Sequence, residues 1–303
     1  MCKLAYVHFQ PHVSGALRQA IVRRITTNSW KMGNDDGVGI TTWTGEDAPV
    51  TVRSLKLATL AWPDSLGDHV LIHTRKSTNT INLANTHPLV GGGAYVVHNG
   101  IVHAGNEVSR IALSEVTHTD NDSELILKAY LGNNRKLSGA LGQLSGWANV
   151  MVYDDKRHVL SVFADRSPML MFRQNGVFII AQASEQIVGV IQRGIGAPFE
   201  EAALPADRIF EFNTSGRMNW AQALSAAVKN AVAFQLPSGL VQTVQTRFPA
   251  AYSIRTYTGH GARTYPEAVA HADDDEEFVY SNDYQMWLSR DEMNRRKAER
   301  DAR

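Results

Sequence analysis

Three observations on the sequence predict a layered α+β fold. The chain has 303 residues, of which 44% are hydrophobic and 20% charged, enough for one large domain or two ordinary ones. Short apolar runs bounded by Gly, Asn, Asp or Pro dominate the first two thirds. Helical spacing clusters between groups of these runs instead of alternating with them one for one, which favours layered α+β over a doubly wound parallel sheet.

The length and the boundaries of these apolar runs are typical of buried strands. Nine runs are expected to be strands: Leu4–His8, Val38–Trp43, His69–Thr74, Ala94–His98, Trp147–Tyr153, His158–Ala164, Met169–Arg173, Val177–Gln182 and Arg208–Phe212.

The helices follow from apolar residues spaced three or four apart. Leu17, Ile21 and Ile25 predict one helix. The same spacing over 125–130 follows an Asp/Ser-rich start that suits an N-cap. Two further helices are expected, at Ser184–Gln192 and Trp220–Phe234.

The C-terminal part changes character. Asp273–Glu277 is a run of five acidic residues, and Ser289 with Glu292 fits a capping box ahead of the polar run Met293–Arg303. We therefore expect one domain over 2–260 and, over 261–303, an acidic linker with a polar helical tail. This tail is either solvated or a docking segment for a partner.

Charge and composition argue against several classes of protein and kinds of metal site. Thirty basic and thirty acidic residues give a net charge of zero, which argues against a general nucleic-acid binder. No apolar run approaches the ~18 residues that span a bilayer, and the start lacks a secretory signal, so no membrane is expected and the expected location is cytoplasmic. The single cysteine excludes an internal disulfide and Cys-rich metal sites.

That cysteine, Cys2, is the first candidate for chemistry. Trimming of Met1 would place a thiol and a free α-amine on one residue. Only about 3% of an ordinary thiol is ionised at pH 7, and the adjacent amine could take its proton. The alternative is a small apolar residue in the first strand.

Three further segments hold candidates, each with a plainer alternative. Arg75 leaves a predicted strand and could clamp a carboxylate, or form a surface ion pair. Asn99-Gly100 could present an amide and a backbone N–H to an oxyanion, or form a hairpin turn. Asp122 could hold an ammonium group, or cap a helix.

Taken together and in this order, the motifs resemble the class II glutamine amidotransferases of the N-terminal-nucleophile hydrolase superfamily, and the stand-alone members in particular. The resemblance covers roughly residues 2–190. Its motifs are Cys2, the Gly- and Asp-containing segment 33–40, His73-Thr74-Arg75, Asn85-Thr86-His87-Pro88, His98-Asn99-Gly100 and Asn121-Asp122-Ser123-Glu124.

The resemblance implies a four-layer αββα sandwich of two mainly antiparallel sheets, and it implies roles for single residues. Cys2 would be the nucleophile and its α-amine the base, while Asn99 and Gly100 would form the oxyanion hole. Arg75 and Thr78 would bind the α-carboxylate of L-glutamine, and Asp122 its α-amine. The three histidines of these motifs would be structural, and the reaction would need no metal or cofactor.

The chain also departs from the family pattern. Lys3, Lys76 and Asn121 replace residues usual at those places, which concerns substrate preference more than reaction type. No synthase signature follows residue 200, so the resemblance implies a separate ammonia-accepting synthase or ligase as partner. Two alternatives remain, a hydrolase of another γ-glutamyl amide or peptide, and a non-catalytic scaffold.

Overall fold

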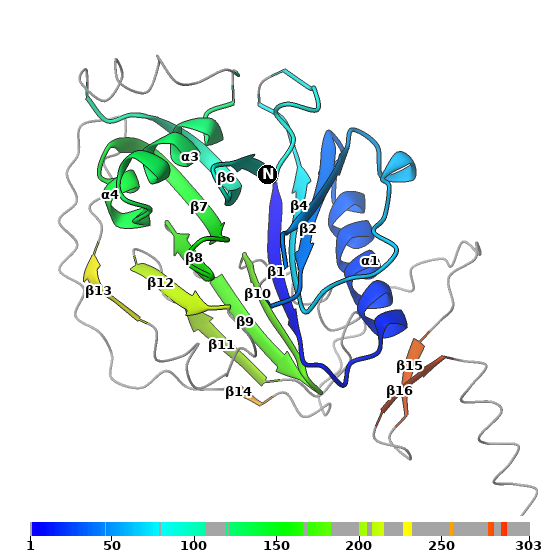
Figure 1. The fold of residues 1–303 in the computed structure, drawn as a ribbon. Helices are drawn as coiled ribbons and strands as arrows, with labels where there is room; N and C mark the ends of the chain where they lie inside the picture. Colours follow the sequence, from blue (N-terminus) through cyan, green and yellow to red (C-terminus); the bar gives the residue numbers. More distant parts are fainter. Residues whose placement is uncertain are drawn as a thin grey trace, which may run out of the picture.

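In the computed structural model, two β-sheets lie face to face, with helices on their outer sides (Figure 1). The structure describes residues 2–45, 47–78, 80–106, 119, 121–165, 169–182, 200–204 and 208–214, and the strand segments 227–231, 255–256, 278–281 and 286–289.

The first sheet has eight strands, in the order β14-β11-β9-β10-β1-β4-β2-β3. All its pairings are antiparallel, and β1 lies between β10 and β4 in its middle. Its strands are β1 (Lys3–Phe9), β2 (Gly37–Trp43), β3 (Val50–Ser54), β4 (His69–Arg75), β9 (Met169–Gln174), β10 (Val177–Gln182), β11 (Glu200–Leu204) and β14 (Arg255–Thr256).

The second sheet has six antiparallel strands, in the order β13-β12-β8-β7-β6-β5. Its longest strands, β6 and β7, pair next to the β5 edge, and this pair carries one wall of the candidate site. Its strands are β5 (Leu89–Gly91), β6 (Ala94–Ala104), β7 (Leu144–Asp154), β8 (Val159–Ala164), β12 (Arg208–Asn213) and β13 (Ala227–Ala231).

Helices cover the outer face of each sheet. α1 (Gly15–Lys31) begins at Ser14, whose Oγ accepts the Leu17 N–H at 3.3 Å, and its apolar face packs on the first sheet. α3 (Ser123–Gly132) and α4 (Leu137–Leu141) pack on the second. A short 3₁₀ helix, Leu57–Thr59, follows β3.

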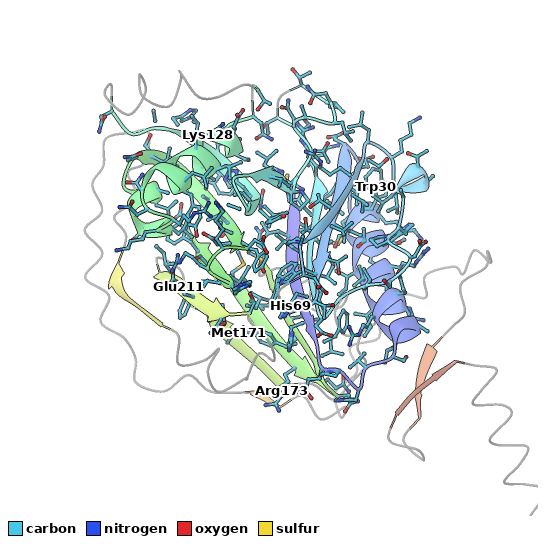
Figure 2. All side chains as sticks on the ribbon, in the orientation of Figure 1. Trp30, His69, Lys128, Met171, Arg173 and Glu211 are labelled. Carbon is cyan, nitrogen blue, oxygen red and sulfur yellow. The ribbon has the colours of Figure 1, made fainter. Side chains whose placement is uncertain are left out.

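A third apolar cluster fills the space between the two sheets. Tyr6 and Leu71 of the first sheet meet Val97 and Met151 of the second there. Figure 2 shows the side chains that fill this space, with His69 and Met171 labelled among them. The molecule therefore has four layers, helix, sheet, sheet and helix, and the predicted αββα sandwich is confirmed.

All nine expected strands and the helices at 17–25 and 125–130 are confirmed, with ends shifted by a few residues. The helix expected over Trp220–Phe234 is wrong at Ala227–Ala231, which forms β13 at the edge of the second sheet and pairs with β12. Pairing with a sheet edge overrides helical spacing there. The alternative of a hairpin turn at Asn99-Gly100 does not hold, since β6 continues through both residues to Ala104.

Several predictions concern residues outside the described part. The helix at Ser184–Gln192, the acidic run Asp273–Glu277 and the polar run Met293–Arg303 lie there. Within 261–303 the structure describes one hairpin, β15 (Phe278–Ser281) with β16 (Met286–Ser289). The domain boundary at 260 stays a prediction. Among the described residues, none of the helices has the length and apolar character needed to cross a membrane.

Candidate active site

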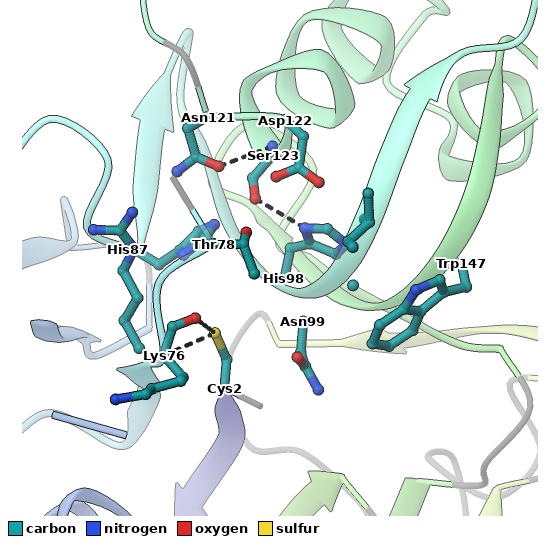
Figure 3. A pocket seen from close by; sticks show the side chains of 13 residues that line it. Cys2, Lys76, Thr78, His87, His98, Asn99, Asn121, Asp122, Ser123 and Trp147 are labelled. Atoms are coloured by element: carbon teal, nitrogen blue, oxygen red, sulfur yellow. Dashed lines mark hydrogen bonds between the residues drawn. The ribbon is translucent and has the colours of Figure 1, made fainter. Parts of the chain in front are cut away.

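A single pocket between the upper ends of the two sheets brings together all six residues singled out from the sequence. It has a volume of about 140 Å³. Cys2, Arg75 and Thr78 line it from the first sheet and the loop that follows β4. From the second sheet and the start of α3 it is lined by Asn99, Gly100 and Asp122 (Figure 3). Its other lining residues are Lys76, His87, His98, Ile101, Asn121, Ser123 and Trp147.

Cys2 directly precedes the central strand β1, and its half-buried thiol faces the pocket. The Lys76 backbone N–H donates to Sγ at 3.3 Å, and the thiol donates to the Lys76 carbonyl at 3.4 Å. Burial raises the pKa of this thiol, and the Lys76 backbone hydrogen bond opposes that rise. The thiol is therefore protonated at neutral pH and needs a base to react.

Arg75 ends β4 and is buried, with 3% of its surface exposed, so its side chain does not lie at the protein surface. Its Nη2 donates to Ser77 Oγ at 2.9 Å and to the Thr80 carbonyl at 3.1 Å. Asp36 holds the same loop from the other side, because its Oδ2 accepts the Ser77 backbone N–H at 2.8 Å. The loop is thus fixed at both ends of the Arg75–Ser77 segment.

The Asn99-Gly100 pair lies inside β6, opposite Asn149 and Ala148 of β7. Gly100 is required here, because a Cβ at this position would lie 2.1 Å from the Trp147 carbonyl oxygen. The Asn99 amide is buried, and its Nδ2 donates to Gln182 Oε1 at 2.8 Å.

Asp122 occupies the N-cap position of α3, but its side chain does not cap the helix. Its Oδ2 instead accepts the backbone N–H of Val102 on β6 at 2.8 Å. Asn121, the departure from the family pattern, joins two loops: its Nδ2 donates to the Asn85 carbonyl at 2.9 Å, and its Oδ1 accepts the Ser123 N–H at 3.0 Å. A carboxylate and a buried amide therefore stand side by side at this end of the pocket.

Three buried histidines lie at the pocket, and two of them, His87 and His98, line it. His73 Nε2 donates to the His98 carbonyl at 3.0 Å, and the His73 ring centre is 4.3 Å from that of His87. His98 Nδ1 and Ser123 Oγ are 2.8 Å apart. Burial lowers the pKa of all three rings, that of His73 to about 3, so they are neutral at pH 7. Their contacts join β4, β6 and α3, which fits the structural role expected of them.

No cluster of three His, Cys, Asp or Glu side chains suited to a metal ion occurs among the described residues. The charged groups at the pocket are instead of the kind that binds an amino acid. A guanidinium and a carboxylate can hold the two ends of a zwitterion. A thiol and an amide face the same space from the other side.

Comparison with known proteins found similar structures but no similar sequence. Neither a family model nor a curated protein matches the sequence. Among solved structures, the chain is similar to glutamine phosphoribosylpyrophosphate amidotransferase from B. subtilis, with a TM-score of 0.51 and 16% identity over 72% of this chain and 48% of that one. It is also similar to "the allosteric regulatory enzyme of purine biosynthesis", with a TM-score of 0.55 and 14% identity over the same shares.

The chain has the fold of the N-terminal-nucleophile amidotransferases. At this level of identity the likeness concerns the fold. The aligned part spans about half the length of each of the two compared chains.

Within this amidotransferase fold, the sequence did not single out Gln182 or Trp147 as site residues. Gln182 was expected only as a strand end, yet it contacts Asn99 across the two sheets. Trp147 lies opposite Ile101 in the β6–β7 pair, and both line the pocket next to Gly100. Only the alternation of side chains along these two strands, read with their register, could have indicated the Trp147–Ile101 pair.

Proposed function

We propose that the chain is a glutamine amidotransferase that releases ammonia from glutamine through a thioester on Cys2. Removal of Met1 exposes the α-amine of Cys2, which takes the thiol proton. Asn99 and Gly100 donate to the oxyanion. Arg75 and Thr78 bind the α-carboxylate of the substrate, and Asp122 binds its α-ammonium group.

The reaction balances without a cofactor. Cys2 Sγ forms a bond to the side-chain carbonyl carbon, and the π electrons of the carbonyl move to its oxygen. This oxyanion collapses, the C–N bond breaks, and the α-ammonium of Cys2 gives its proton to the departing ammonia. Water then cleaves the thioester to glutamate and restores the thiol. One oxyanion-hole donor contributes about 2.7–4 kcal/mol to such a step in known enzymes.

The observation that supports this proposal is the convergence of six residues on one pocket. They are spread over positions 2 to 122, and five different elements or loops carry them. Cys2 and Asn99 face each other in Figure 3, with Asp122 at the far end and Thr78 between. This order matches the order of groups along glutamine, whose amide lies at one end and whose charged groups lie at the other.

The proposed partner is a synthase or ligase that consumes the ammonia, and residues 200–303 carry no phosphate-binding loop that would mark such an activity there.

A second candidate is hydrolysis of a γ-glutamyl amide with a larger amine. Ile101 is 41% exposed, and with the half-buried Trp147 it gives the pocket an apolar wall beside the oxyanion hole. An apolar amine could lie against this wall, which ammonia does not need.

The test is an assay of ammonia and glutamate from glutamine, beside amine release from a panel of γ-glutamyl amides. Mass spectrometry of the same sample reports whether Met1 is absent. We expect equimolar ammonia and glutamate, loss of both in Cys2→Ala, and a Cys2 adduct with a glutamine-like electrophile. Turnover of the panel without turnover of glutamine would select the second candidate, and an intact Met1 with no adduct would select the scaffold.

A further inference from the structure

We infer that Gln182 is a positioning residue, which fixes the Asn99 amide with its NH₂ group toward the sheet that carries Cys2. This inference rests on the proposed function, and it concerns a residue to which neither the motifs nor the family resemblance gives a role. The contact that carries it is the hydrogen bond from Asn99 Nδ2 to Gln182 Oε1, at 2.8 Å.

The two residues come from different sheets. Asn99 lies in the middle of β6, while Gln182 ends β10. β10 pairs with β1, and Ala181 is opposite Ala5. Gln182 therefore lies beside the start of β1, the strand that directly follows Cys2. Both amides are buried, Asn99 to 4% and Gln182 to 6% exposure, so water does not compete for this contact.

Orientation matters because the two ends of an asparagine amide have nearly the same shape and opposite chemistry. The NH₂ end can donate to an oxyanion, whereas the carbonyl end would repel it. Gln182 presents an acceptor, Oε1, and so selects the orientation with NH₂ toward the first sheet. Within the described part of the chain, Nδ2 makes this one hydrogen bond, which leaves its second hydrogen for the substrate.

The energetic consequence falls on the transition state. Glutamine in its ground state has a neutral carbonyl, and the charge on oxygen develops only as Sγ attacks. A donor that is held in place before the reaction needs no reorganisation at that moment. Loss of the Gln182 acceptor should therefore lower kcat while leaving substrate binding at Arg75 and Asp122 unchanged.

The variant Gln182→Met tests this, because Met has a similar length and no strong acceptor. Gln174→Met is the matched control, since Gln174 is also a buried glutamine of the first sheet but lies outside the pocket. We expect Gln182→Met to lower kcat for ammonia release by about 10- to 100-fold, with KM within about twofold of wild type. Gln174→Met should keep both constants.

Two readouts separate positioning from a merely structural effect. The aldehyde analogue of glutamine forms an oxyanion with Cys2, so Gln182→Met should weaken its binding by the same factor and leave glutamate binding unchanged. In the Asn99→Ala background, Gln182→Met should have no further effect, because the amide that it positions is gone. Where Met prevents folding, Gln182→Asn withdraws the acceptor by one methylene and retains polarity.

Unchanged kcat in Gln182→Met would overturn the inference, and so would additive losses in the double variant or a parallel loss of glutamate binding. Failure of the proposed function is a different result: wild type would then turn over neither glutamine nor any γ-glutamyl amide, and the inference would fall with it.

Discussion

The Sγ atom of Cys2 lies 3.3 Å from the backbone nitrogen of Lys76, the residue that directly follows Arg75. Cys2, the candidate nucleophile, therefore contacts the chain directly after Arg75, the residue expected to bind the substrate carboxylate. Lys76 itself points outward, where its Nζ lies 3.1 Å from Asp35 Oδ1 and 3.5 Å from Asp36 Oδ2.

Asp122 gives the first prediction, in which Asp122→Asn raises KM for glutamine by about 10- to 100-fold, as expected for loss of a charge-assisted hydrogen bond. Asn retains an oxygen that can accept the Val102 N–H, so the fold should be preserved. Steady-state kinetics check this, with Asp155→Asn, in the β7–β8 turn, as control. An equal change in both variants, or an unchanged KM, would contradict the assignment of Asp122 to the substrate.

Gly39 gives a prediction about stability. β2 crosses the loop that carries His87 so closely that a Cβ on Gly39 would lie 2.0 Å from the His87 carbonyl oxygen. We expect Gly39→Ala to lower the free energy of unfolding by about 1–3 kcal/mol, as overpacking does elsewhere. Denaturant titration measures it. Gly15→Ala is the control, because no atom lies within 4 Å of a Cβ there, and a similar loss in it would refute the steric explanation.

The buried carboxylate of Asp154 gives a third prediction. It is fully buried, and the hydroxyl of Tyr130 donates to its Oδ2 at 2.8 Å, which joins α3 to the end of β7. Tyr130→Phe should cost about 1.5–3 kcal/mol in free energy of unfolding, the usual value for a hydrogen bond to a charged group. The matched change Tyr95→Phe, at a buried tyrosine of β6, should cost less than about 0.5 kcal/mol. Equal losses would disprove a special contribution from the Asp154 contact.

The buried histidines predict how stability depends on pH. Burial lowers the pKa of His73 to about 3 and that of His8 to about 4, both below the unfolded value of about 6.5. Between the folded and the unfolded pKa values, the unfolded chain binds more protons than the folded chain. The free energy of unfolding therefore falls as the pH falls below 6.5. Denaturant titrations at pH 7, 6 and 5 should show a steeper loss in wild type than in His73→Gln, by up to ~1.4 kcal/mol per pH unit. Parallel curves would count against a neutral, buried His73.

Much of the fold follows from local pattern. Strands such as Val177–Gln182 have apolar runs with clear boundaries, and the helix that contains Leu17, Ile21 and Ile25 has one apolar face that packs on a sheet. Trp220–Phe234 shows the limit, because pairing with β12 decided the structure of Ala227–Ala231 and no local pattern reports a partner strand.

The residues of the candidate site were predictable where a sequence motif contains them. They were missed where only the pairing of strands brings them to the site. Asn99-Gly100 has the local pattern of a turn, yet pairing with β7 keeps it extended. Gln182 is 83 residues from Asn99, so their contact depends on how the two sheets face each other. Helix capping was the plainer alternative for Asp122, but its carboxylate accepts the Val102 N–H of β6 instead of capping α3, a contact that no local pattern reports.

The place of Cys2, at the head of a central strand and inside the pocket wall, decides how the protein should be produced for study. Residues retained ahead of Cys2 would convert its α-amine into an amide, which could not serve as the proposed base. Under the proposed function an affinity tag belongs at the C-terminus, because a preparation tagged ahead of Cys2 would lack the free amine that the proposed mechanism uses.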